Sequence, residues 1–101
     1  MFRATTPTHI FILPFDTEQV KEVRVTYANE KKEVILQKTE ADCVLDGTDI
    51  KVELTQEETL LFEAELRVLI QLRVLTTSGK VMASKIWRKF AHECLDEEVL
   101  S

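Results

Sequence analysis

Apolar side chains occupy every second position in the stretch from Leu66 to Leu75. The members of this series are Leu66, Val68, Ile70, Leu72 and Val74. Successive side chains of a strand point to opposite faces of a sheet, so a period of two predicts a strand whose even-numbered side chains are buried. Ser78-Gly79 follows, and glycine tolerates the positive φ that a tight reversal needs. The pattern therefore predicts a hairpin that joins this strand to a second one at Val81–Phe90.

Shorter runs predict five further strands. They lie at residues 8–13, 23–27, 33–38, 43–45 and 50–54. Asp46-Gly47 separates the last two and is a strong hairpin signal. Thr55–Glu58 has the side-chain cap and early carboxylates of a helix start, with room for only a turn or two. The spacing predicts an all-β fold, an immunoglobulin-like antiparallel β-sandwich of about seven strands with one short helical turn.

The C-terminal half also carries a helical pattern. Six residues have the spacing of one amphipathic helix face: Ala83, Ile86, Trp87, Phe90, Ala91 and Cys94. Glu57–Leu75 is rich in the helix formers Leu, Glu and Arg, and the chain has only two glycines and two prolines. The alternative is thus an α+β fold with a helical C-terminal half, in which Val81–Cys94 is helix. The unbroken alternation favours the hairpin.

Length and composition are those of one globular domain. The chain has 101 residues, 45% of them hydrophobic and 31% charged, which suits a single modest core. We expect one β-sandwich domain at residues 1–92 and an acidic C-terminal tail at residues 93–101. The net charge of −5 argues against a nucleic-acid partner, which requires a basic surface. No apolar run approaches the roughly 20 residues that span a bilayer, so no membrane partner is expected.

The N-terminal sequence and the two cysteines bear on the compartment. Met1–Pro7 lacks the charged segment and apolar core of a signal peptide, which predicts synthesis in the cytoplasm. Cys43 and Cys94 are the only cysteines. In a chain without an export signal, we expect both to be free thiols.

The reactive side chains do not predict an active site. His92-Glu93-Cys94 could contribute to a soft metal site, but no further histidine or cysteine pair has ligand spacing, and a solvated tail is the favoured interpretation. Cys43 follows Asp42, whose negative charge disfavours a reactive thiolate. A glycine-rich phosphate loop, a G-x-S-x-G sequence and a paired-carboxylate signature are all absent. We therefore expect a protein that is not an enzyme and that holds no metal and no cofactor.

Charge is unevenly distributed along the chain. Ala64–Phe90 carries a net +5, which leaves −10 for the remainder of a chain whose total is −5. Two interpretations stay open: a solvated surface with weak intramolecular pairs, or a bipolar surface that orders copies of itself or a partner. The single tryptophan, Trp87, is either a packing residue or an interface anchor. The candidate interface residues are Arg67, Arg73, Lys85, Trp87, Arg88 and Lys89.

Three segments carry a family resemblance: Pro7–Asp16 (PTHIFILPFD), Leu54–Phe62 (LTQEETLLF) and Val68–Ser84 (VLIQLRVLTTSGKVMAS). They resemble small proteins encoded among the structural genes of phages and prophages of Gram-positive bacteria. The arrangement is also similar to the N-terminal β-sandwich of phage baseplate upper proteins. The resemblance covers nearly the whole chain and contains no catalytic motif, so it offers no functional residues to carry over.

This resemblance implies a non-catalytic virion structural component, or one that assembles the tail or baseplate. Its partners would be other phage structural proteins or further copies of itself. The protein would be made in the host cytoplasm and carried in the virion. The alternative is a protein of another class, a cytoplasmic adaptor or regulatory protein-binding module.

Overall fold

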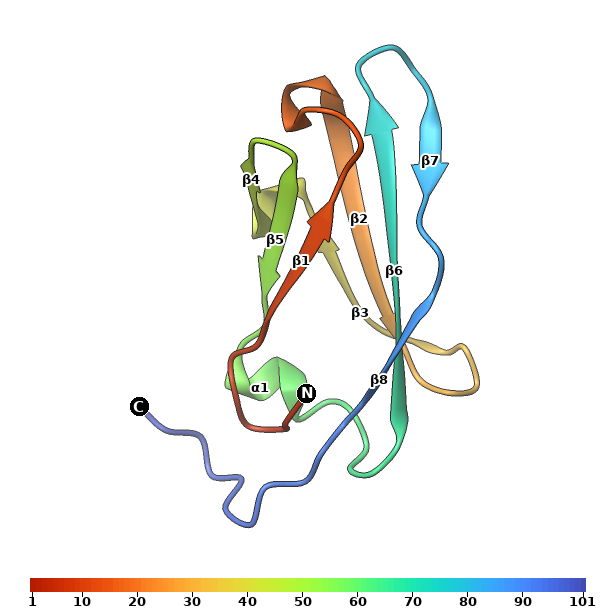
Figure 1. The fold of residues 1–101 in the computed structure, drawn as a ribbon. Coiled ribbons are helices and arrows are strands. Elements are labelled where there is room, and N and C mark those ends of the chain that lie inside the picture. Colours follow the sequence, from red (N-terminus) through yellow and green to blue (C-terminus); the bar gives the residue numbers. More distant parts are fainter.

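Two antiparallel sheets build the fold in the computed structural model, which describes residues 1–101. The strands are β1 (Thr8–Ile12), β2 (Val20–Ala28), β3 (Val34–Thr39), β4 (Cys43–Asp46), β5 (Asp49–Glu53), β6 (Arg67–Thr76), β7 (Val81–Ala83) and β8 (Trp87–Phe90). The small sheet has the order β1-β5-β4, and the large sheet has the order β3-β2-β6-β7, with β8 also paired to β6. The two sheets face each other across the core (Figure 1). The predicted all-β sandwich is confirmed.

The helical elements are short. α1 (Gln56–Thr59) begins with a capping box, in which the Thr55 hydroxyl accepts from the Glu58 N–H and the Glu58 carboxylate accepts from the Thr55 N–H. This confirms the helical turn predicted after Leu54. Two 3-10 turns, η1 (Thr17–Gln19) and η2 (Glu40–Asp42), complete the set.

The core lies between the inner faces of the two sheets. The large sheet contributes Val23, Val25, Tyr27, Val68, Ile70, Leu72 and Val74, and the small sheet contributes Phe11, Ile50 and Val52. β6 is central, because β2 pairs with one of its edges and β7 and β8 pair with the other. Phe62, from the segment after α1, packs on Tyr27 with 6.0 Å between ring centroids.

Two details of the predicted hairpin are wrong. Val81–Phe90 forms two strands instead of one, because the Ser84 hydroxyl accepts from the Leu72 N–H at 3.0 Å and interrupts the ladder. This raises the count from seven strands to eight. Leu66 precedes β6 and is 39% exposed, although its even position predicts burial. The helical alternative for the C-terminal half is also wrong, since β7 and β8 are both strands.

Both cysteines are free thiols. Cys43 begins β4 and packs against the core, and burial together with the charge of Asp42 raises the pKa of its thiol. The Cys94 thiol donates to the Arg3 carbonyl at 3.1 Å. For Cys43 this raised pKa acts against ionisation, so its environment does not favour a reactive thiolate at neutral pH.

Candidate protein-binding surfaces

The outer face of the large sheet carries four arginines, which we call the arginine face: Arg24, Arg67, Arg73 and Arg88. All four are exposed. Each is flanked in its strand by side chains that point inward, so alternation directs the arginine outward. The strand register arranges them as two pairs along β6, because Arg24 lies opposite Arg73 and Arg88 lies opposite Leu69, two residues after Arg67.

No arginine of this face has an ion-pair partner. The three ion pairs of the chain join Arg3 to Glu97, Lys38 to Glu58 and Lys51 to Asp46. Like charges directly opposite on neighbouring strands are destabilising, which applies to Arg24 and Arg73. Both line a shallow hollow of about 560 Å³, together with Glu22, Glu40, Leu75 and others. The four guanidinium groups are therefore available to carboxylates of a partner, which they can bind in bidentate fashion.

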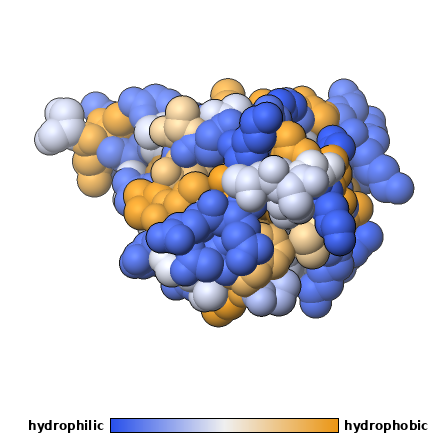
Figure 2. All heavy atoms as spheres, turned by 90° about the horizontal axis from the view of Figure 1, so that it is seen from above, coloured by the Kyte–Doolittle hydropathy of each residue, from blue (hydrophilic) through white to orange (hydrophobic).

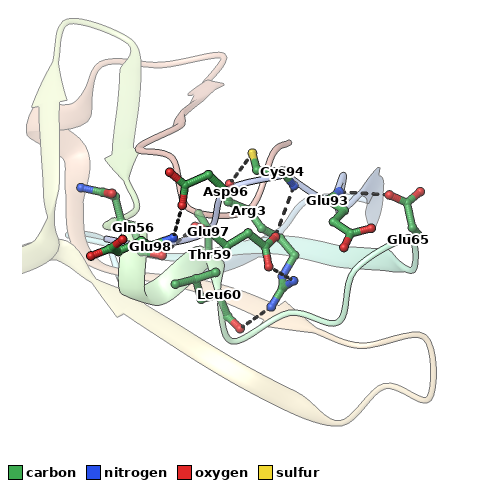
Figure 3. Close-up of polar contacts among 10 residues, drawn as sticks. All are labelled: Arg3, Gln56, Thr59, Leu60, Glu65, Glu93, Cys94, Asp96, Glu97 and Glu98. Atoms are coloured by element: carbon green, nitrogen blue, oxygen red, sulfur yellow. Dashed lines mark hydrogen bonds and ion pairs between the residues drawn. The ribbon is translucent and has the colours of Figure 1, made fainter. Parts of the chain in front are cut away.

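Carboxylates gather at a different place, which we call the acidic end: α1, the segment that follows it and the acidic tail (residues 93–101). The exposed members are Glu57, Glu63, Glu65, Glu93, Asp96 and Glu98. The Gln56 side chain fixes the tail to α1, donating to the Leu100 carbonyl at 2.7 Å and accepting from the Leu100 N–H at 2.8 Å. Arg3 pairs with Glu97 at 2.6 Å and also donates to the Leu60 carbonyl (Figure 3).

The six residues singled out from the sequence lie in three places. Arg67, Arg73 and Arg88 belong to the arginine face. Trp87 and Lys89 point to the inner side of the sheet, opposite Ile70 and Val68. Lys85 lies in the break between β7 and β8. Sequence reasoning missed Arg24, because its position beside Arg73 depends on the pairing of β2 with β6.

Trp87 is half-buried, and it packs against the small sheet. Its ring lies 5.1 Å from that of Phe11 between centroids. Beside it lies a groove of about 450 Å³, which we call the apolar groove, between β1 with its following loop and β7. Leu72 and Val74 of β6 line it, as do Leu13 and Met82. Seen from above, the surface shows apolar patches separated by hydrophilic side chains (Figure 2).

One polar pair lies between the sheets. His9 Nδ1 and the Tyr27 hydroxyl are 2.9 Å apart. Burial raises the pKa of Tyr27, so its hydroxyl stays protonated, and it donates to or accepts from Nδ1 according to the tautomer of His9. Burial lowers the pKa of His9, and the charges of Lys89 and of the N-terminus lower it further. The pair fits a packing role, because neutral His9 satisfies a hydroxyl buried in the core.

We expect the domain to lose stability as the pH falls through 6.5, the ordinary pKa of histidine. Because the folded state lowers the pKa of His9, the unfolded chain binds this proton more readily and is favoured at acidic pH. Urea unfolding at about pH 7.5, 6.5 and 5.5 should show a decline that is smaller in His9→Gln. Equal slopes in the two proteins would contradict the assignment.

The ionisation of Glu58 does not interfere with this measurement. Its ion pair with Lys38 and its hydrogen bonds to Thr55 outweigh its desolvation and lower the pKa of the carboxyl below the ordinary 4.5. Its contribution to stability is therefore lost only at more acidic pH, outside the range tested for His9.

Comparison with known proteins assigns the chain to no family. The chain matched no protein-family model, no curated protein and no solved structure. None of its helices has the length and apolar character needed to cross a membrane, and no group of three or more side chains could hold a metal ion. The arginine face, the acidic end and the apolar groove therefore carry the functional interpretation.

Proposed function

We propose that this domain is a non-catalytic assembly component of a phage or prophage particle, in the tail or baseplate region, that acts through contacts between subunits. The observation that carries the proposal is the arginine face, four exposed guanidinium groups on one sheet without a carboxylate partner. The resemblance of three segments to phage structural proteins points to the same class.

The position of the charges suggests how copies would meet. The arginine face and the acidic end are different surfaces of one chain, so a contact between them is head-to-tail. Such contacts build rings or filaments instead of simple pairs. Arginine binds carboxylates in a fixed bidentate geometry, which would set the orientation of each added copy. Another phage structural protein with an acidic surface would bind the same face.

We expect self-association that weakens as salt rises. The Debye length falls from about 10 Å at 0.1 M salt to about 3 Å at 1 M, so exposed charge pairs are screened. Sedimentation velocity should show larger species at low salt than at high salt. Arg73→Glu with Arg88→Glu should weaken association about tenfold or more, since an attraction becomes a repulsion. The fold should survive, because surface changes usually alter stability by about 0.5 kcal/mol or less.

The matched control reverses two lysines outside the arginine face. Lys31→Glu with Lys80→Glu changes the net charge by the same amount in two exposed turns. We expect this variant to associate more strongly than the arginine variant. Equal weakening in both would mean that net charge, not the arginine face, governs association. A strict monomer at every salt and protein concentration would remove self-association and leave only binding to another protein.

The particle assignment has a separate test. Portal, capsid or tail genes beside the coding gene would support it, and the protein should co-purify with particles released after prophage induction. Flanking regulatory genes and absence from purified particles would favour the adaptor class instead.

A further inference from the structure

The large sheet extends one strand position beyond the small one. Across its width lie β3, β2, β6 and then β7 with β8, whereas the small sheet holds only β4, β5 and β1. β1 ends the small sheet, and its Phe11 lies against Trp87. Beyond β1, no strand of the small sheet faces β7 (Figure 1). The apolar groove lies at this place, between β1 with its following loop and β7.

One end of the groove carries a lysine. Next to Trp87 the groove adjoins a hollow of about 270 Å³ that is lined by β1 residues, Ile70 and Lys89. Lys89 belongs to β8 and has no ion-pair partner. An extended segment with apolar and acidic residues would therefore find a complementary environment.

β1 offers an open edge to such a segment. It pairs only with β5, so its other edge is free. Its sequence, Thr8–Ile12 (THIFI), contains no acidic residue, lysine or arginine, and Ile10 and Ile12 are 55% and 77% exposed. Proteins commonly protect free edges with charged side chains. An unprotected edge beside an apolar groove is suited to strand addition, in which backbone hydrogen bonds hold an incoming extended segment.

We propose that the apolar groove receives the acidic tail of a second copy, which adds to the small sheet as a strand beside β1. This inference rests on the self-association proposed above and names the segment that one copy gives to the next. The tail has no regular secondary structure. It combines carboxylates with the apolar side chains of Leu95, Val99 and Leu100, of which Leu95 is fully exposed and Leu100 is 73% exposed.

Hydrogen bonds and one ion pair hold the tail to its own domain. They include the Arg3–Glu97 ion pair (Figure 3) and the two hydrogen bonds between Gln56 and Leu100. Transfer of Leu95 into the groove would bury an apolar side chain that is fully exposed in the single copy. The carboxylates of the tail would meet Lys89 at the end of the groove.

The path of the chain favours insertion of the tail into the groove of a second copy over insertion into the groove of its own copy. β8 runs away from Trp87, and the chain is then held to the N-terminal segment before the tail begins. The His92 N–H donates to the Met1 carbonyl at 2.8 Å, and the Arg3 N–H donates to the His92 carbonyl at 2.9 Å. The tail therefore starts past Phe90, at the far end of β8 from Met82, and would have to reverse to reach its own groove.

A complementation experiment tests this exchange. The tail variant is Leu95→Asp with Val99→Asp, and the groove variant is Met82→Glu with Lys89→Glu; all four side chains are exposed. We expect each variant alone to self-associate at least tenfold more weakly than wild type in sedimentation velocity. An equimolar mixture should recover a dimer and nothing larger, because one intact tail meets one intact groove. Circular dichroism verifies that each variant is folded.

The control variant is Val44→Glu with Lys31→Glu, which places similar changes on exposed residues away from the groove. It should associate as wild type does. If the tail variant associates normally while the groove variant does not, the occupant is another strand, such as β1 of a second copy, and the inference is wrong. If both associate normally but the arginine variant does not, the arginine-face proposal stands without the exchange. A wild-type protein that is monomeric throughout overturns both.

Discussion

Replacement of Ile70 by alanine should lower the free energy of unfolding by about 2–5 kcal/mol, the range for truncation of a buried aliphatic side chain. Ile70 is 2% exposed and lies in β6, with Tyr27 opposite it on one side and Trp87 on the other. Truncation removes apolar contacts and leaves a cavity between two packed sheets. Because strands pair with both edges of β6, the site cannot easily collapse. Urea unfolding followed by circular dichroism measures the loss.

Leu69→Ala is the matched control one position away. Leu69 is only 8% exposed, yet it lies on the outer face beside Ala28 and Arg88, where no second sheet covers it. Truncation there opens to solvent and leaves no enclosed cavity. We expect a loss of about 2–2.5 kcal/mol, from the transfer of three carbon groups at about 0.8 kcal/mol each, without an added cavity term. A loss as large as that of Ile70→Ala would contradict the inner and outer assignment.

Side-chain alternation predicted the central strand because it is a local signal. Residues from Val68 to Val74 keep their predicted phase, with the even positions buried. The phase fails at Leu66 because the backbone turns just before it, where Glu65 has a φ of 64°. The capping box at Thr55 was equally local and was predicted correctly.

Features that depend on pairing between distant segments could not be predicted. The amphipathic spacing after Ala83 favoured a helix as well as a strand, and pairing with β6 decides between them. The break at Ser84 arises from a side-chain hydrogen bond to the backbone of another strand. The arginine face needs the register that sets Arg24 opposite Arg73. The apolar groove arises because the large sheet is wider than the small one. No single segment of the sequence carries that information.

The hydrogen bond between His9 and Tyr27 should be detectable as a coupling energy. Tyr27 is completely buried, and its hydroxyl lies 2.9 Å from His9 Nδ1. Tyr27→Phe keeps the ring in the core but leaves the imidazole nitrogen without its partner. We expect a loss of about 1–2 kcal/mol in the free energy of unfolding at about pH 7.5, where His9 is neutral, because an unpaired polar atom retains its desolvation cost.

The double variant separates this bond from the packing around it. When His9→Leu accompanies Tyr27→Phe, both polar atoms disappear and no unsatisfied group remains. The double variant should therefore lose less stability than the sum of the single losses, by about 1 kcal/mol, when urea unfolding is compared around the full cycle. Additive losses would show that the two groups do not interact. Non-additivity is expected because either polar group costs stability when it is buried without the other.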